Sequence, residues 1–172
     1  MLKVIGLILI ISSSTVLGFA YGEKFYKRVR ELKEFQRAVY ILKNEINFCH
    51  SLLPDALMKV YEKCDEPIRT IFKDIAMKLR GEEDVNVYSC FEEGININLS
   101  KVSLKEKDIS IIMDLAKTLG EMDIDGHNDI LGLAMEELGK AISEAEVNLD
   151  KNVKMYRYLG FSFGAMIGII LL

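Results

Sequence analysis

The residues best suited to metal chemistry are three acids in the stretch MDIDGHND. Asp123, Asp125 and Asp129 offer carboxylate oxygens, which are the ligands that Ca²⁺ prefers in proteins. A calcium loop that began at Asp123 would need glycine at its sixth position and glutamate at its twelfth, where the chain has Asn128 and Ala134. We therefore expect no calcium site, and we interpret the stretch as an acidic turn between helices.

Cysteine and histidine do not form a metal pattern either. The neighbours Cys49 and His50 have no second cysteine–histidine pair at ligand spacing, and His127 stands alone. An odd number of cysteines at irregular spacing is not typical of a disulfide framework and suits a reducing compartment. The sequence also has no P-loop and no GxSxG, HExxH or CxxC motif. We predict a non-enzymatic protein with no catalytic residue, no metal and no cofactor.

The charge balance argues against nucleic acid as a partner. Lysine and arginine number 22 against 26 aspartates and glutamates, which gives a net charge of −4. Proteins that bind nucleic acids usually carry a net basic surface. Half of the residues are hydrophobic although 28% are charged, so the apolar residues must be concentrated in particular segments.

The first of these segments is at the N-terminus. No charged residue occurs from Val4 to Tyr21, a run long enough to cross a hydrocarbon core of about 30 Å as a helix. The basic residues that follow favour the cytoplasmic side for this flank: they are Lys24, Lys27, Arg28, Arg30 and Lys33. The alternative is a signal peptide cleaved after Ala20, which would yield a secreted or membrane-tethered helical binding module.

The second apolar segment is at the C-terminus and is flanked in mirror fashion. Lys151, Lys154 and Arg157 precede it, and no basic residue follows it. Because a helix rises about 1.5 Å per residue, the run from Tyr158 to Leu172 is shorter than a full bilayer core, so a re-entrant or interfacial helix is an alternative. Both flanks predict the same topology, with the middle of the chain inside and the two tips outside.

Glycines in both apolar segments are four residues apart. Gly160, Gly164 and Gly168 share one helical stripe, and Gly18 and Gly22 repeat the spacing. Because glycine lets another backbone come close in a membrane helix, we interpret these stripes as packing faces, for each other or for partner spans. The alternative is that glycine is simply common in membrane helices.

Between the two ends, apolar residues recur at spacings of three and four, which predicts helices nearly throughout. Pro54 and Asp55 suit the first turn of a short helix, and SLKE from Ser103 to Glu106 fits a capping box. The other helices are expected to begin near Phe25, Ile68, Val87 and Ile130, and the last could run unbroken into the terminal apolar segment.

This pattern predicts an all-α fold with three parts. Residues 1–22 form an N-terminal transmembrane helix, and residues 23–156 form a cytoplasmic six-helix antiparallel bundle. Residues 157–172 form a C-terminal transmembrane or membrane-inserted helix. A bundle of this length can bury a core without disulfides.

Along its whole length the sequence resembles the stage III sporulation protein AB family of endospore-forming bacteria. The resemblance rests on segments in a fixed order: MLKVIG at the start, LKNEI at Leu42–Ile46, the Pro67-to-Phe72 spacing, LGEMD at Leu119–Asp123 and NVKMYRYLGFSFG at Asn152–Gly164. The chain departs from the family in two places. Val29 stands between Arg28 and Arg30 where the family commonly has proline, and no tryptophan occurs near Phe91.

The resemblance implies a soluble fold similar to the cytoplasmic domain of type II secretion F proteins. It also implies a non-enzymatic scaffold in the cell membrane, with its bundle facing the mother-cell cytoplasm, in the channel-like complex that links mother cell and forespore. The implied partners are the other membrane proteins of that complex and its cytoplasmic ATPase, stage III sporulation protein AA. A homo-oligomer is compatible with this role. For the protein-interaction surface we choose the basic helix, at Arg28 and Arg30, and the acidic turn, at Asp123, Asp125 and Asp129.

Overall fold

The computed structural model describes residues 2–81, 86–121 and 127–171. Within these ranges the backbone alone is described for residues 2–11, 14, 15, 17, 18, 121, 127–129, 157, 160, 161, 163–165 and 168–171. The chain divides into two compact units. Unit 1 comprises Met1–Val29 and Glu144–Leu172, and unit 2 comprises Arg30–Ser143.

The described part of the chain is helical and has no strand, which confirms the all-α prediction. Its elements are α1 (Leu2–Asn47), α2 (Leu53–Lys63), α3 (Ile68–Gly81), α4 (Val87–Asn98), the short 3-10 helix η1 (Leu99–Lys101), α5 (Glu106–Glu121) and α6 (His127–Leu171). The apolar stripe that begins near Phe25 lies within α1, which is one uninterrupted helix. The unbroken last helix was predicted correctly.

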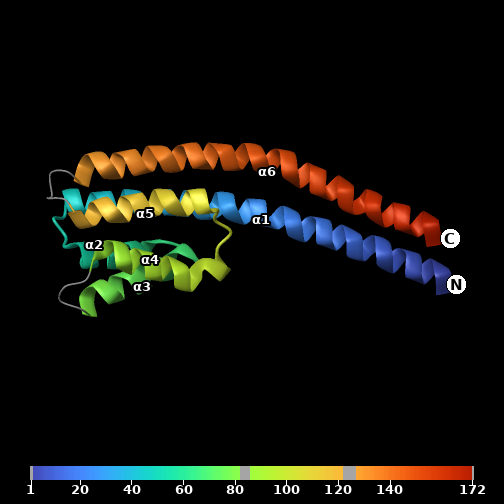
Figure 1. Ribbon diagram of the computed structural model, residues 1–172, viewed down its shortest axis with the longest axis horizontal. Coiled ribbons are helices and arrows are strands. Elements are labelled where there is room, and N and C mark those ends of the chain that lie inside the picture. The colour runs from blue at the N-terminus through green and yellow to red at the C-terminus, as the bar shows by residue number, and fades with distance from the viewer. Residues whose placement is uncertain (1, 82–85, 122–126, 172) are drawn as a thin grey trace. The chain divides into compact units, whose positions relative to one another are not determined.

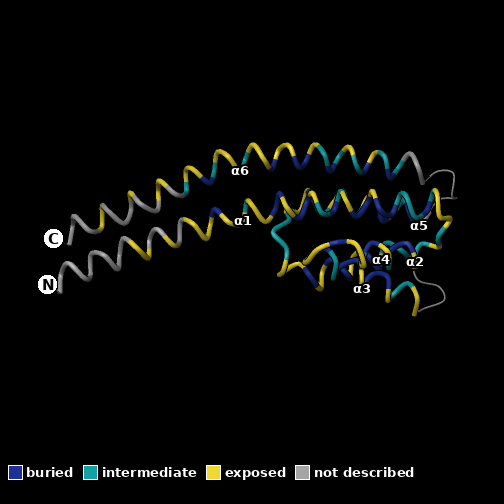
Figure 2. The backbone as a smooth tube through the Cα atoms, turned by 180° about the vertical axis from the view of Figure 1, so that it is seen from behind, coloured by how far each residue is buried: buried dark blue, intermediate teal, exposed yellow. Residues whose placement is uncertain are grey.

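In unit 2, α2 packs on α3, α3 on α4 and α4 on α5 (Figure 1). The apolar stripes indicated by the sequence form the core, and buried positions occur on each of the six described α-helices (Figure 2). Phe72 on α3 links three helices. Its ring centroid lies 5.5 Å from that of Phe35 on α1 and 6.3 Å from that of Phe91 on α4. Such aromatic pairs stabilise a core beyond the area that they bury.

Small residues on α6 leave room for polar side chains of α1 within unit 2. The Gln36 amide donates a hydrogen bond to the backbone oxygen of Met135 at 3.0 Å. A Cβ added at Gly139 would lie 3.4 Å from Gln36 Nε2, and one added at Gly132 would lie 3.8 Å from Lys43 Nζ. The two helices therefore approach through glycine positions, with long polar side chains lying across them.

Of the two helix starts that the sequence predicts from local signals, one is correct and one is wrong. Pro54 and Asp55 lie in the first turn of α2, as predicted. The capping box at Ser103 is wrong, because α5 begins at Glu106 and the Lys105 N–H donates to Asp108 Oδ2 at 2.9 Å. The capping carboxylate is thus two residues later than the sequence suggested. The Asp108 side chain is fully buried, so it serves the helix start from inside the bundle.

Unit 1 consists of two helical segments that run side by side, so that the two chain ends lie together (Figures 1 and 2). A Cβ added at Gly22 on α1 would lie 3.7 Å from Val153 Cγ1 on α6. The ring of Tyr156 stacks with those of Tyr21 and Phe25, at a centroid distance of 5.9 Å in each case. Glycine and aromatic residues therefore form the contact between the two helices.

No helix has a stretch of described side chains that is long and apolar enough to cross a bilayer. Much of the two predicted membrane segments, 1–22 and 157–172, lies outside the described side chains. The flanking membrane helices therefore stay predictions.

Candidate functional site: a charged cleft between α1 and the α2–α3 turn

Unit 2 contains a cleft of about 190 Å³, which we call the charged cleft. One wall comes from a single turn of α1, and the other comes from the turn that joins α2 to α3. Its lining residues are Arg30, Glu31, Glu34, Asp65, Glu66, Pro67 and Ile68. The Glu66–Pro67 peptide bond in the second wall is cis.

Glu34 fixes the two walls together. Its Oε1 accepts the backbone N–H of Asp65 at 2.8 Å and the Arg37 guanidinium at 3.2 Å. A hydrogen bond from an N–H to an ionised carboxylate is about twice as strong as a neutral one. Because Glu34 lies on α1 and Asp65 follows α2, this bond sets the position of the turn relative to the helix.

Glu31 is a buried acid of the cleft lining, with only 2% of its surface exposed. Its Oε2 accepts the backbone N–H of Ser103 at 2.6 Å. A buried carboxylate is tolerated only where hydrogen bonds replace its lost hydration. The charge of Glu31 therefore anchors the segment between η1 and α5 to α1, in addition to lining the cleft.

Cys64 lies next to the cleft wall and is buried. Burial, together with the nearby Glu34 carboxylate, raises the pKa of its thiol from an ordinary 9.0 to about 12. A thiol must ionise to act as a nucleophile or metal ligand. Cys64 is therefore neutral at physiological pH, and it serves packing rather than chemistry.

The lining favours binding of charged side chains. Its exposed charged residues are Arg30, Asp65 and Glu66. In the part of the chain that the structure describes, no group of three histidine, cysteine or acidic residues could hold a metal ion. On another protein, lysine and arginine could form ion pairs with these carboxylates, and an acidic side chain could form one with the guanidinium.

Arg28 and Arg30, predicted together as contact residues, differ in their exposure. Arg30 is exposed and lines the charged cleft. Arg28 is 4% exposed and has polar partners within the chain. A partner protein can reach Arg30 directly, whereas it could reach Arg28 only if the helix surroundings rearranged. We therefore keep Arg30 as the contact residue of the basic helix.

The other predicted positions lie mostly outside the description. Asp123 and Asp125 are outside the described residues, and the side chain of Asp129 is outside the described side chains. For Gly18, Gly160, Gly164 and Gly168 only the backbone is described, so their packing is not. Gly22 is described and lies against Val153, as given above.

The carboxylates of the cleft were not predicted from the sequence. Glu31 precedes Leu32 and lies four residues before Phe35, both of which are buried. An acid at this spacing falls on the edge of the apolar stripe, where a purely solvated side chain is not expected. That mismatch was the available signal. Asp65 and Glu66 carried none, because acidic residues are ordinary in turns.

The comparisons with known proteins agree with one another. A sequence model of the family described as stage III sporulation protein AB matches residues 3–172. The protein called stage III sporulation protein AB from Bacillus subtilis (strain 168) is 26% identical over 172 residues, covering 100% of each chain. A solved structure of a stage III sporulation protein AB has a TM-score of 0.65 at 22% identity and covers 71% of this chain and 95% of that chain. At that identity, the structural likeness indicates a shared fold.

Proposed function

Because the chain belongs to the stage III sporulation protein AB family, we propose that it is a non-enzymatic membrane scaffold of the secretion-like channel between mother cell and forespore. The observation that carries this proposal is the family match, which extends over essentially the whole chain. A full-length relative of the same name agrees with it. The role in endospore formation follows from the family, and the scaffold role is our inference.

The membrane part of the proposal is supported by the chain ends. The uncharged run from Val4 to Tyr21 is long enough to span a bilayer, and basic residues follow it. The two ends lie together in unit 1 (Figure 1), as two neighbouring membrane helices require. We propose that both ends enter the cell membrane and that unit 2 faces the mother-cell cytoplasm.

The scaffold part is supported by the charged cleft. Its exposed Arg30, Asp65 and Glu66 suit ion pairs with another protein. The fold is expected to be similar to the cytoplasmic domain of type II secretion F proteins, whose complexes pair such a platform with a cytoplasmic ATPase. We propose the ATPase of the complex, stage III sporulation protein AA, and the neighbouring membrane proteins as partners. Fold analogy alone would be a weak reason, so the family match is the main support.

Cysteine accessibility tests the topology. In a chain with Cys49, Cys64 and Cys90 replaced by alanine, Lys59→Cys or Lys117→Cys places a single thiol on an exposed position of unit 2. We expect neither to react with a membrane-impermeant maleimide in intact sporulating cells, and both to react after lysis. A thiol placed before Met1 provides the control for an external tip. Labelling of either unit 2 position in intact cells would overturn the proposed orientation.

Sporulation itself tests the contact surface. In a spore-forming strain without its own copy, Arg30→Glu is expected to reduce heat-resistant spores and to reduce co-purification of the ATPase. Lys117→Glu makes the same charge change at an exposed lysine of α5 and should leave both intact. Equal sporulation with the two variants would argue against the charged cleft as a contact surface.

The secreted-module alternative has its own test. Cleavage after Ala20 would remove the first helical turns of α1, so the purified protein would have a lower mass. An intact mass equal to that of the chain from Met1 excludes cleavage. A mass equal to that of the chain from Tyr21 would replace the membrane proposal with the secreted module.

A further inference from the structure

A second group of charged residues lies outside the charged cleft, on an exposed face that α2 and α3 form in unit 2. Two cations of α3 converge on one aromatic ring of α2. The Arg69 guanidinium carbon is 4.6 Å from the centroid of the Tyr61 ring, and the Lys73 ammonium nitrogen is 5.7 Å from it. We call these three residues the Tyr61 clamp.

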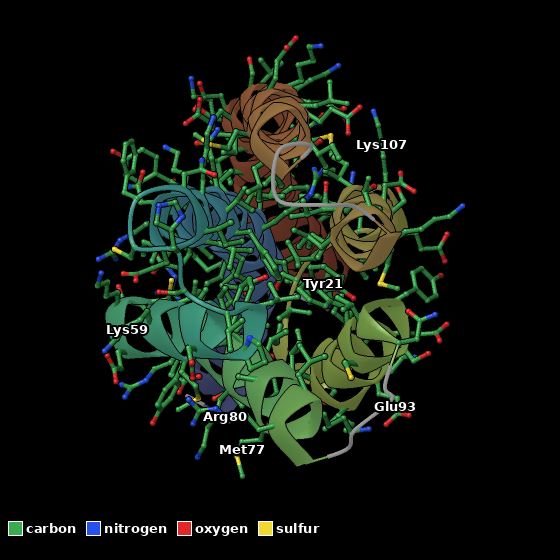
Figure 3. All side chains as sticks on the ribbon, turned by 90° about the vertical axis from the view of Figure 1, so that its left-hand side faces the viewer. Tyr21, Lys59, Met77, Arg80, Glu93 and Lys107 are labelled. Carbon is green, nitrogen blue, oxygen red and sulfur yellow. The ribbon has the colours of Figure 1, made fainter. Side chains whose placement is uncertain are left out.

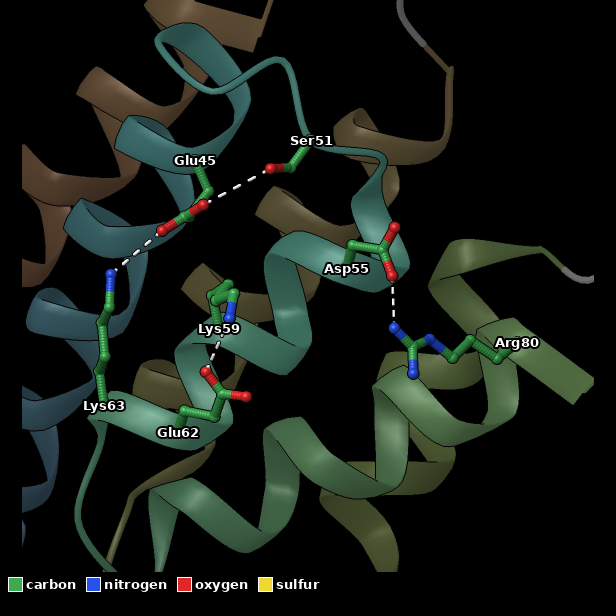
Figure 4. A network of polar contacts seen from close by, with 7 residues as sticks. All are labelled: Glu45, Ser51, Asp55, Lys59, Glu62, Lys63 and Arg80. Carbon is green, nitrogen blue, oxygen red and sulfur yellow. Dashed lines mark hydrogen bonds and ion pairs between the residues drawn. The ribbon is translucent and has the colours of Figure 1, made fainter.

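The two cations of the clamp have no acidic partner among the described residues. Other exposed cations of α2 and α3 behave differently: Lys59 pairs with Glu62 at 2.9 Å, and Arg80 pairs with Asp55 (Figure 4). Three of the acids close in sequence to the clamp have other partners. Glu62 holds Lys59, Glu66 accepts the hydroxyl of Thr70 at 2.6 Å, and Asp74 accepts the Asn98 amide at 2.9 Å.

Arg69 and Lys73 are like charges at positions i and i+4 of α3, and such a pair repels weakly. Cation–π attraction to the face of the Tyr61 ring offsets this repulsion and holds both cations beside the ring. An anion placed between Arg69 and Lys73 would remove the repulsion and add charge-assisted hydrogen bonds.

The geometry also leaves the cations able to bind. A guanidinium that stacks on a ring uses its flat face, while its N–H groups point outward along its edges. Those edges fit a carboxylate in a bidentate manner. Lys73 is exposed, and Met77, one helical turn later on the same stripe, is 58% exposed (Figure 3). The surface therefore offers two cations with an apolar neighbour.

We propose that the Tyr61 clamp binds carboxylate side chains of an acidic segment on a partner protein, with Met77 packing against an apolar residue of that segment. A protein carboxylate fits better than nucleic acid, because the chain has a net charge of −4 and two cations cannot follow a row of phosphates. This proposal concerns a surface separate from the charged cleft, and it does not depend on the membrane topology.

Binding of fluorescein-labelled poly-L-glutamate to the purified full chain in detergent tests the clamp by fluorescence anisotropy. Replacing both cations, Arg69→Gln with Lys73→Gln, is expected to weaken binding about tenfold or more, since two charge-assisted bonds are lost. Tyr61→Phe keeps the ring and should bind like the wild type. Tyr61→Leu removes the ring and should weaken binding several-fold.

The matched control is Lys59→Gln with Lys63→Gln. It removes the same charge at the same spacing on α2, but from lysines already paired with Glu62 and Glu45. It should bind nearly as well as the wild type. An equal loss in this control, or no binding by the wild type at physiological salt, would overturn the proposal. So would preferential binding of tripolyphosphate or of phosphatidylglycerol vesicles that requires the same two cations.

A charge exchange provides a second, independent readout. The variant Arg69→Glu with Lys73→Glu should lose poly-L-glutamate and gain poly-L-lysine. In sporulating cells, a photo-crosslinking residue at Met77 should form its adduct within an acidic segment of one protein. An adduct mapped to a segment without acidic residues would contradict the proposal. This test is separable from that of the proposed function, because the Arg30→Glu variant leaves the clamp intact.

Discussion

The Glu31 carboxylate on α1 accepts the backbone N–H of Ser103 at 2.6 Å, across 72 positions of sequence. It holds the segment before α5, whose helix begins at Glu106 instead of at the predicted capping box. Ser103, the residue expected to cap the helix, has its N–H committed to α1. Two carboxylates therefore order this loop: Glu31 accepts the Ser103 N–H and Asp108 accepts the Lys105 N–H.

Removing this carboxylate should destabilise the fold. We expect Glu31→Ala to lower the free energy of unfolding by about 1–3 kcal/mol, because the Ser103 N–H loses its partner in a partly buried position. Urea unfolding followed by circular dichroism measures the change. Glu92→Ala, at an exposed glutamate of α4, is the matched control and should leave the midpoint unchanged. Equal midpoints for the two variants would show that the bond contributes nothing.

The close approach of α3 and α4 predicts a strict requirement for glycine. A Cβ added at Gly94 would lie 2.6 Å from Ile75 Cγ1, and Ile75 is fully buried. We expect Gly94→Ala to destabilise the chain by about 1–3 kcal/mol through overpacking.

The control for Gly94 is another glycine substitution. A Cβ added at Gly81 meets nothing within 4 Å, so Gly81→Ala should leave the thermal midpoint unchanged or raise it slightly. Thermal unfolding of both variants decides the matter. A drop in midpoint for Gly81→Ala as large as that for Gly94→Ala would mean that backbone effects, and not packing, control both positions.

The contact between α1 and the end of α2 predicts that the pKa of the Glu45 carboxyl depends on Lys63. Glu45 accepts a hydrogen bond from Lys63 at 3.1 Å and one from Ser51 at 3.5 Å (Figure 4). The bond from Lys63 is the main cause that lowers the pKa of Glu45 below its ordinary 4.5. We expect Lys63→Met to move this pKa upward, as measured by carboxyl-carbon NMR.

The sign of the stability effect follows from linkage. Because the pKa of Glu45 is lower in the folded state, the ion pair stabilises the fold above pH 4.5, and this contribution is lost as the pH falls through the folded value. The difference in stability between wild type and Lys63→Met should therefore shrink in acid. A difference that stays constant from neutral pH to acid would contradict the assignment.

Much of the fold could be predicted from the sequence because it depends on periodic signals. The buried stripe of α1, which includes Phe35 and Val39, is the one that the spacing indicated. Pro54 and Asp55 marked the start of α2 for local reasons that the structure preserves. In each case the information lies within a few residues of the feature itself.

Neither the charged cleft nor the Tyr61 clamp could be predicted in the same way. Glu34 and Asp65 meet across 31 positions, and Arg69 and Lys73 meet Tyr61 from a different helix. Nothing local distinguishes these side chains from solvated ones. Only the packing of α1, α2 and α3 decides which exposed charges converge, so the sequence indicated a basic helix but not its acidic counterpart.

Gly22 tests whether the helices of unit 1 need a small residue at their contact. An added Cβ would lie in ordinary contact with Val153, at 3.7 Å. Gly22→Ala should therefore be tolerated, whereas Gly22→Leu should push the two helices apart. Cross-linking between cysteines that replace Tyr21 and Tyr156 measures the separation, and the Leu variant is expected to cross-link more slowly. Equal rates for Ala and Leu would mean that Gly22 is not a packing position.

The buried thiol of Cys64 predicts an alkaline loss of stability. Its pKa is about 12 in the folded chain against an ordinary 9.0, so the unfolded chain releases this proton first as the pH rises. The contribution of the neutral thiol is therefore complete below pH 9.0 and is lost progressively toward the folded value, by at most about 1.4 kcal/mol per pH unit. Unfolding free energies measured across this range should fall more steeply for the wild type than for Cys64→Ala. Cys49, which is exposed, provides the control, since Cys49→Ala should keep the wild-type slope. Parallel slopes for the wild type and Cys64→Ala would show that the thiol ionises equally in the folded and unfolded states.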